Sequence, residues 1–230
     1  MMPRVEVLES APAVADAAAE FIAAEARSSI EARGIFTLAV SGGRTPWLML
    51  RSLAGRDLPW ASVHLWQVDE RVAADGDADR NLTQLHDSLL AKVPLAPNQV
   101  HAMPVTVADL EAGAHRYSAT LRALAGDPPV LDLVHLGLGS DGHTASLVPG
   151  DASLDVMDAD VALAGPYQGR RRMTLTFPLI NRARRVLWVV TGADKAAMFR
   201  RLLDGDRTIP AGRVCQHRAV MLADRAAAGE

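Results

Sequence analysis

The sequence predicts an α/β fold in which helices cover a mostly parallel sheet. Short apolar runs of strand length alternate with segments of helical periodicity along the chain. Two of these runs end in glycine-rich turns, at Gly42-Gly43 and at Gly137 and Gly139, directly before polar residues. We see no repeat, linker or low-complexity segment in the sequence, so we predict one domain over residues 1–230.

In the first half of the chain, capping residues mark the ends of helices. Ser10 and Pro12 suit the N-cap and first turn of a helix that runs to about Arg33 and that Gly34 ends. Asn81 is suited to cap a later helix. The other elements predicted here are strands at 5–8, 35–40, 63–68 and 100–103, and helices at 47–53 and 82–90.

The second half continues the alternation. The apolar run at 131–136 is short enough to be a strand buried on both faces, and we expect His135 within it to be buried with its hydrogen bonds satisfied. Apolar and polar residues alternate at 172–177, which predicts an antiparallel or half-exposed strand. The remaining predictions are helices at 107–124 and 193–203 and strands at 161–164, 186–190 and 219–222.

The composition argues against several classes of function. A net charge of −3 gives no electrostatic reason to bind nucleic acid or an anionic membrane. No apolar run reaches the ~18 residues needed to span a bilayer, and acidic residues interrupt the alanine-rich N-terminal segment, so we expect no signal peptide. Cys215 is the only cysteine, which fits a reducing compartment. We expect a soluble cytoplasmic protein that is a monomer or a weak homo-oligomer.

The stretch GLGSDGHTASLVPG at 137–150 places polar side chains at the end of the buried strand. In open α/β sheets, ligands bind at the carboxyl ends of the strands. Gly142 lacks a Cβ beside His143, so that backbone amides and the imidazole can both approach a substrate. Histidine exchanges its proton near neutral pH, which suits His143 to acid–base chemistry. The alternative is a capped polar turn in which His143 is merely exposed.

Two further turns follow predicted strands. Gly42-Gly43 lies between a strand and a helix, where free backbone amides and the helix N-terminus favour a phosphate group, although an ordinary tight turn fits the same residues. The sequence matches neither common nucleotide-binding glycine motif. Asp69-Glu70-Arg71 comes directly after a buried strand on the same side of the sheet, which favours a site over a solvated loop.

Read together, four segments of this chain resemble the 6-phosphogluconolactonase family. They are SGGRTP at 41–46, DER at 69–71, GLGSDGHTASLVPG at 137–150, and RMT at 172–174 with the INRARRVLWVVTGADKA that follows. The resemblance implies a Rossmann-like three-layer α/β/α sandwich, like that of glucosamine-phosphate deaminases and ribose-phosphate isomerases. It also implies a carboxylic ester hydrolase that converts 6-phospho-D-glucono-1,5-lactone to 6-phosphogluconate in the oxidative pentose phosphate pathway.

The residues suit this chemistry. His143 would act as general base on water, with Asp141 or alternatively Asp69 orienting its ring. Backbone amides of residues 137–143 would stabilise the oxyanion, and the phosphate would lie on the 41–45 loop. Arg44 either adds a phosphate contact or points to solvent. The substrate-binding residues expected are Ser41, Gly42, Gly43, Arg44, Thr45, Arg71, Gly139, Gly142 and Arg172.

Neither a metal nor a cofactor is expected, because lactone hydrolysis needs only activated water and the histidines show no metal-ligand spacing. Two other functions remain open. A sugar-phosphate isomerase or deaminase of the same fold would use Asp69 as its base, although Arg71 and the HTAS sequence after Gly142 favour the lactonase. A non-catalytic sugar-phosphate sensor would usually carry an appended DNA-binding segment, for which we expect no room in the chain.

Overall fold

A computed structural model describes residues 3–230, in which a seven-stranded sheet has the order β1-β10-β9-β6-β2-β3-β5. Every pair of neighbouring strands in this sheet is parallel, which confirms the predicted α/β fold. The strands are β1 (Arg4–Leu8), β2 (Phe36–Val40), β3 (Val63–Gln67), β5 (Val100–His101), β6 (Leu133–Leu136), β9 (Arg185–Val190) and β10 (Ala219–Asp224).

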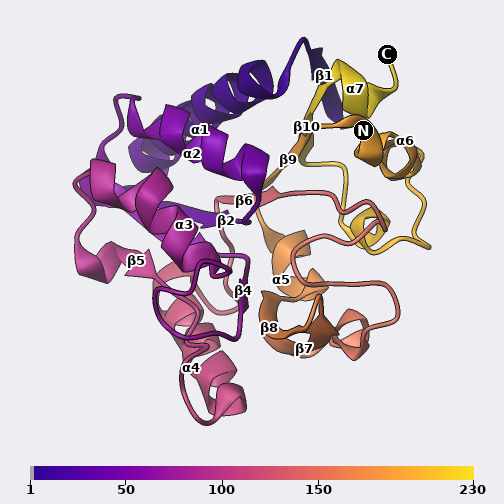
Figure 1. The fold of residues 1–230 in the computed structure, drawn as a ribbon. Helices are drawn as coiled ribbons and strands as arrows, with labels where there is room; N and C mark the ends of the chain where they lie inside the picture. Colours follow the sequence, from indigo (N-terminus) through magenta and orange to yellow (C-terminus); the bar gives the residue numbers. More distant parts are fainter. Residues whose placement is uncertain (1–2) are drawn as a thin grey trace.

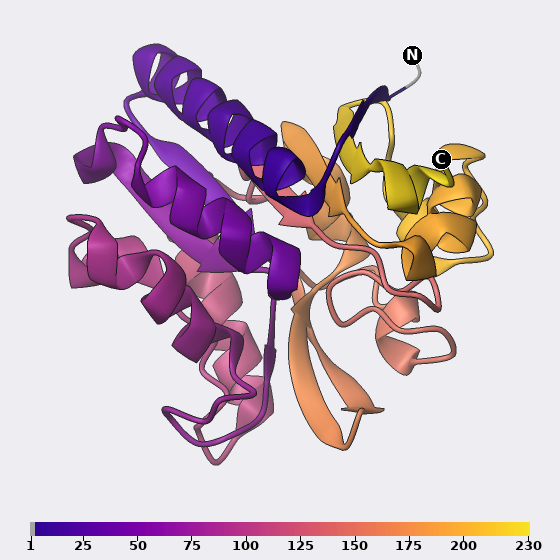
Figure 2. The ribbon, with the colours of Figure 1, turned by 45° about the horizontal axis from the view of Figure 1, so that its top comes forward.

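Helices cover both faces of the sheet and make the sandwich three layers deep (Figures 1 and 2). One core packs α1 (Ala11–Arg33), α2 (Arg44–Ala54) and α3 (Asn81–Ser88) against one face. A second core lies on the other face, where Trp66 and Trp188 are fully buried. The helices of that face are α4 (Leu110–Ala125), α5 (Phe177–Arg182), α6 (Ala196–Leu203) and α7 (Arg225–Ala228).

A second sheet of three antiparallel strands stands beside the main one. It consists of β4 (Asp69–Arg71), β8 (Arg170–Leu175) and β7 (Val161–Tyr167), in the order β4-β8-β7. The antiparallel strand predicted at 172–177 is thus present, but it runs from 170 to 175 and Phe177 begins α5. Residues 69–71, expected as charged residues after a strand, are themselves a strand of this sheet.

The order of the main sheet places two loops next to each other. From β2 the chain continues to β3 and β5 on one side, whereas from β6 it continues to β9 and β10 on the other. Strand order therefore reverses between the adjacent strands β2 and β6, and α/β proteins bind ligands in the crevice at such a point. The loops leaving these strands carry residues 41–43, directly before α2, and 137–143, which are far apart in the sequence.

Several helix ends differ from the prediction. Asn81 is the first residue of α3 rather than its N-cap, because the buried Glu70 carboxylate accepts hydrogen bonds from the N–H groups of Asn81 (2.7 Å) and Leu82 (2.8 Å) and caps the helix instead. The helix predicted from 107 begins at Leu110, since Asp109 supplies the cap. Residues 193–195 form a 3₁₀ turn before α6.

None of the helices within residues 3–230 combines the length and apolar character that crossing a bilayer requires. The division of the chain into one domain, predicted for residues 1–230, stays a prediction. Met1 and Met2 lie outside the described residues.

Candidate active site

The turn after β6 pairs Asp141 with His143. Oδ1 of Asp141 lies 2.6 Å from Nδ1 of His143 and accepts a second hydrogen bond, of 3.1 Å, from the His143 backbone N–H. Because a carboxylate only accepts hydrogen bonds, the proton of the ring contact belongs to Nδ1, and in the neutral tautomer the lone pair is on Nε2. Burial acts to raise the pKa of Asp141, but the hydrogen bonds and charge of His143 outweigh it and lower this pKa. Asp141 therefore stays ionised beside the ring.

Glycines make this close packing possible. A Cβ on Gly139 would lie 2.1 Å from Nδ1 of His143 and 2.6 Å from the Asp141 carboxylate, so only glycine fits beneath the pair. Gly142 has a φ of +84°, and its N–H donates to the Gly139 carbonyl. The N–H groups of Gly139, Gly142 and His143 all donate within the turn. The expected stabilisation of an oxyanion by the 137–143 amides therefore does not extend to these three.

Asp69 is held by other partners. Its Oδ2 accepts a 2.6 Å hydrogen bond from Ser146 Oγ and lies 3.9 Å from the guanidinium of Arg172. The side-chain amide of Asn81 donates to the backbone carbonyl of Asp69 at 2.9 Å and to its Oδ1 at 3.4 Å. Ser146, Asn81 and Arg172 thus hold the Asp69 side chain in place at the wall of the cavity. Of the two carboxylates considered for His143, only Asp141 makes a hydrogen bond to it.

Two arginines stand side by side next to Asp69. Arg71 on β4 and Arg172 on β8 are paired across the antiparallel strands. Burial lowers the pKa of Arg172, and the neighbouring charge of Arg71 adds to this effect while Asp69 opposes it. Among residues 3–230, neither buried Nε has a hydrogen-bond partner. One nitrogen of each guanidinium already donates to a backbone carbonyl, of Asp79 and of Tyr167, but both arginines line the cavity and bring positive charge that favours an anion.

A cavity of about 150 Å³ brings most of the predicted residues together. Those that line it are Ser41, Gly42, Asp69, Arg71, Gly139, His143 and Arg172. Gly142 does not line it, and Asp141 reaches it through its hydrogen bond to His143. His143, both arginines and Gly42 of the glycine loop thus face one space, an arrangement suited to the hydrolysis of a charged ester.

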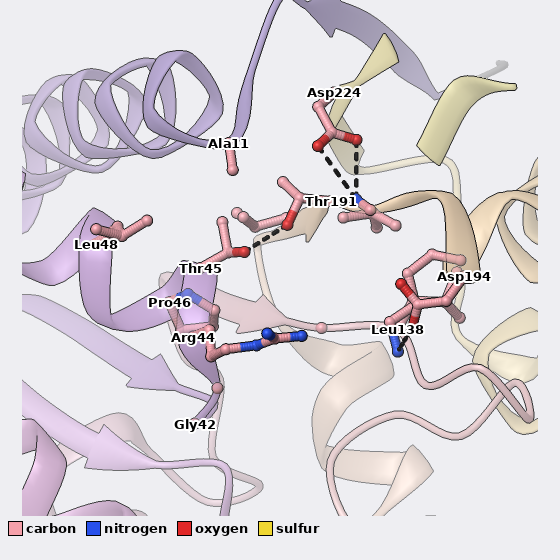
Figure 3. A pocket seen from close by; sticks show the side chains of 16 residues that line it. Ala11, Gly42, Arg44, Thr45, Pro46, Leu48, Leu138, Thr191, Asp194 and Asp224 are labelled. Carbon is pink, nitrogen blue, oxygen red and sulfur yellow. Dashed lines mark hydrogen bonds and ion pairs between the residues drawn. The ribbon is translucent and has the colours of Figure 1, made fainter. Parts of the chain in front are cut away.

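Gly43, Arg44 and Thr45 line a neighbouring cavity of about 440 Å³ instead (Figure 3). The two cavities share Gly42 and Lys195. Figure 3 shows Arg44 extending across this second cavity from the start of α2. Thr45 Oγ1 lies 2.5 Å from Thr191 Oγ1, which ties α2 to the loop after β9. The predicted phosphate loop therefore borders both spaces, with Gly42 at their junction.

Sequence reasoning missed two residues of this site. Lys195 lines both cavities from the turn before α6, and its position after Thr191-Gly192 at the end of a buried strand was the available signal. Asn81 lines the smaller cavity, where its Oδ1 is buried and has no hydrogen-bond partner in the described part of the chain. The sequence suggested that Asn81 caps a helix. Because capping already accounts for an Asn before a helical pattern, nothing in the sequence was a reason to place Asn81 in the site.

Gly42 gives a direct test of how tightly the loop is built. A Cβ at this position would lie 2.0 Å from Oδ1 of Asn81, so Gly42→Ala must displace Asn81 from Asp69. A clash of this kind costs about 1–3 kcal/mol, and we expect kcat/KM to fall about tenfold while the protein stays folded. Gly55→Ala at the other end of α2, where the nearest atom is 3.5 Å away, is the matched control. Equal activity of both variants would contradict this account of the loop.

His135 lies beneath the site and is completely buried, as expected. Its Nδ1 accepts a 3.3 Å hydrogen bond from the Ser41 N–H, but Nε2 has no partner among residues 3–230, so the expectation that its hydrogen bonds are satisfied is only half met. Burial lowers the pKa of His135 to about 3. Burial, aided by His64, also lowers the pKa of His101, to about 4.

The lowered pKa values of His135 and His101 predict how the free energy of unfolding depends on pH. Between about pH 6.5, where an unfolded histidine titrates, and the lowered folded pKa, the unfolded chain binds more protons, so acidification favours unfolding. His135 alone should reduce the free energy of unfolding by about 2 kcal/mol between about pH 7.5 and 5. Urea unfolding at several pH values measures this change. A constant free energy of unfolding over that range would contradict the lowered pKa values of His135 and His101.

Comparisons with known proteins find similarity to one family over most of this chain. The model of a family described as glucosamine-6-phosphate isomerases/6-phosphogluconolactonase matches residues 9–222. A 6-phosphogluconolactonase of Synechocystis sp. is 38% identical over 199 residues, which cover 85% of this chain and 82% of that protein. One from Streptomyces coelicolor is 34% identical over 247 residues, covering 99% and 94%.

Solved structures show the same likeness. A 6-phosphogluconolactonase from Thermotoga maritima has a TM-score of 0.86 at 25% identity, covering 96% of this chain and 98% of that one. One from Trypanosoma brucei has a TM-score of 0.84 at 25% identity, covering 99% and 98%. A monomeric glucosamine-6-phosphate deaminase reaches a TM-score of 0.82 at 20% identity, covering 98% and 99%, and this likeness concerns the fold alone.

Proposed function

Because this chain belongs to the family of glucosamine-6-phosphate isomerases and 6-phosphogluconolactonases, we propose that its His143 activates the water molecule that attacks the lactone substrate. Its activity is that of a 6-phosphogluconolactonase, a hydrolase of the pentose phosphate pathway. The substrate of the proposed mechanism is 6-phospho-D-glucono-1,5-lactone and the product is 6-phosphogluconate. The single observation that carries the proposal is the 2.6 Å contact between Asp141 and Nδ1 of His143.

The proposed reaction has two proton transfers. Water attacks the carbonyl carbon of the lactone while Nε2 of His143 removes one of its protons. The tetrahedral intermediate then breaks the bond between that carbon and the ring oxygen, and the imidazolium returns the proton to this oxygen. The products are a hydroxyl group and a carboxylic acid, which ionises. Asp141 holds the ring and stabilises the imidazolium between the two steps, because its carboxylate faces Nδ1.

We propose that the phosphate of the substrate is anchored on the Gly42-Gly43 loop together with Arg71 and Arg172. Within the described residues, the N–H groups of Gly42 and Gly43 make no hydrogen bond, and they lie at the N-terminus of α2, which favours an anion. Lys195 borders the same junction between the two cavities and adds a third cation. Held there, the phosphate would orient the lactone carbonyl towards His143.

The surroundings of Asp69 argue against the isomerase or deaminase alternative. A base that moves a proton next to a carbonyl must be free to accept it, yet Asp69 already accepts from Ser146 and Asn81 and lies against Arg172. The decisive assay follows disappearance of 6-phosphogluconolactone, corrected for spontaneous hydrolysis, in parallel with glucosamine-6-phosphate. Accelerated lactone loss without ammonia release is expected. Ammonia release with no effect on the lactone would overturn the proposal.

We further propose that catalysis needs no metal ion or cofactor, because an ester carbonyl attacked by activated water requires no Lewis acid. Activity should therefore survive prolonged treatment with EDTA. The measurement compares kcat before and after dialysis against the chelator, then after adding back single divalent ions. Loss of activity that one of these ions restores would contradict the prediction.

The cytoplasm remains our proposed location and a monomer or weak homo-oligomer our proposed state. The exposed Cys215 suits a reducing compartment, where it would stay unpaired. Sedimentation at increasing protein concentration tests the state of association.

A further inference from the structure

Tyr167, which plays no part in the mechanism above, reaches the candidate site from the end of the β7–β8 hairpin. It is the last residue of β7 and pairs with Arg170 across the turn formed by Gln168 and Gly169. Both turn residues have positive φ, +53° and +78°, as in the tight two-residue turns that match the twist of a hairpin. The turn holds the end of β7 in one place and so fixes where the Tyr167 side chain begins.

The phenol of Tyr167 contacts both members of the Asp141–His143 pair. Its hydroxyl donates to Oδ2 of Asp141 at 3.2 Å and lies 3.5 Å from Nδ1 of His143. The ring stands edge-on to the imidazole with 5.1 Å between centroids. Burial, together with the nearby charge of Asp141, raises the pKa of Tyr167, so the hydroxyl keeps its proton and can donate it.

This contact completes the hydrogen bonding of the Asp141 carboxylate. Oδ1 receives the ring and backbone N–H groups of His143, and Oδ2 receives the Tyr167 hydroxyl. A carboxylate held at one oxygen can rotate about its Cβ–Cγ bond, whereas one held at both oxygens has its plane fixed. The plane of Asp141 in turn determines where the imidazole points.

The same side chain also touches Arg172. The guanidinium carbon of Arg172 lies 5.1 Å from the centre of the Tyr167 ring, a distance at which a cation is attracted to an aromatic face. The guanidinium also donates a 3.3 Å hydrogen bond to the backbone carbonyl of Tyr167. Arg172 is otherwise close to Asp69, at 3.9 Å. Tyr167 is thus a direct link between the proposed base and a proposed substrate-binding arginine.

We propose that Tyr167 is a positioning residue: its hydroxyl fixes the orientation and tautomer of the Asp141–His143 pair, and its ring fixes the place of Arg172. The inference rests on the proposed function, since it takes His143 as the base and Arg172 as a substrate contact. The hydroxyl and the ring of Tyr167 have separate roles in this proposal, and two substitutions can remove them one after the other.

Tyr167→Phe removes the hydroxyl and keeps the ring. We expect kcat on 6-phosphogluconolactone to fall about three- to tenfold, the scale of one hydrogen bond, with KM within about twofold of the parent. We also expect a changed proton distribution in the His143 ring. In the parent, ¹⁵N spectra of the imidazole should show the proton on Nδ1; in Tyr167→Phe they should show a mixture of the two tautomers. Tyr167→Leu also removes the ring, and KM should then rise by about a further two- to fivefold.

Gln168→Asn is the matched control, because it changes the same exposed hairpin turn without touching the pair, and Asn tolerates positive φ. Its kcat, KM and ring spectra should equal those of the parent. A Tyr167→Phe protein with the parent's kcat, or with a lower kcat but unchanged ring spectra, would overturn the role of the hydroxyl. A KM in Tyr167→Leu no higher than in Tyr167→Phe would overturn the role of the ring.

The spectroscopic readout also distinguishes failure of this inference from failure of the proposed function. It is recorded without substrate and reports only on the ring of His143. If His143→Ala were fully active while Tyr167→Phe still shifted the tautomer, the positioning contact would stand and the choice of base would be wrong.

Discussion

His143→Ala lowers kcat on 6-phosphogluconolactone by about a hundredfold or more, the contribution expected of a general base. The reason is geometric, since Asp141 occupies Nδ1 and leaves Nε2 as the free proton acceptor in a cavity that also holds the arginines. Steady-state kinetics with the spontaneous rate subtracted give the number. The far-ultraviolet circular dichroism of the variant should match the parent, because His143 lies in a surface turn.

His86→Ala is the control for this substitution. His86 is an exposed histidine on α3 that lines neither cavity of the site, so its loss should leave kcat unchanged. Near-normal turnover of His143→Ala would remove His143 from the mechanism. The role of base would then pass to Asp69 or to Asp141.

Arg71→Ala and Arg172→Ala each lower kcat/KM on the phosphorylated lactone. The fall corresponds to a loss of about 1.5–3 kcal/mol of transition-state stabilisation, the scale of a hydrogen bond to a charged group. Both kcat and KM should suffer, because a phosphate bound away from the reacting carbonyl orients the ester as well as binding it. Unphosphorylated gluconolactone, a poor substrate for the parent, should be handled by the variants nearly as well as by the parent. Initial rates on both substrates provide the comparison.

Arg171→Ala serves as the matched control, since Arg171 is the exposed neighbour of Arg172 on β8 and lines neither cavity of the site. If Arg71→Ala and Arg172→Ala lower kcat/KM equally on the phosphorylated and the unphosphorylated lactone, the arginines support the chemistry or hold Asp69 rather than the phosphate. The phosphate contact would then be sought at Arg44 or Lys195, which line the larger cavity. Arg170 is less suited, because it is paired with Asp77 and Asp79.

The main sheet was predictable because its strands carry their own signal. The run 186–190 is buried on both faces and apolar throughout, and 36–40 is equally buried with Thr37 as its one polar residue. This pattern is typical of parallel strands between layers of helices. The small antiparallel sheet was not recognised as a whole. Residues 69–71 are three charged residues with no strand pattern, and β8 alone holds them in place as a strand.

The candidate site could be predicted where residue type and local turn coincide. His143 and Asp141 are two residues apart on one turn, so their contact needs no long-range packing. Tyr167 and Lys195 come from a hairpin and a helix start whose positions depend on the whole fold. Lys195 had only the weak signal of following a strand end at Thr191-Gly192, and Tyr167 sits in no pattern that suggests chemistry. Asn81 was assigned a capping role that Glu70 performs, because a buried carboxylate from another strand cannot be foreseen from the helix sequence.

The central claim is that neutral His143 takes a proton from the attacking water. The most direct measurement is the rate of enzyme-catalysed lactone disappearance, corrected for spontaneous hydrolysis, between about pH 5 and 8 for the parent and for His143→Gln. The parent rate should fall towards acid pH, where histidine side chains become protonated, while the variant should show a small residual rate without this acid limb. A parent profile that is flat over this range, or a His143→Gln protein that keeps the parent's rate and acid limb, would contradict the claim.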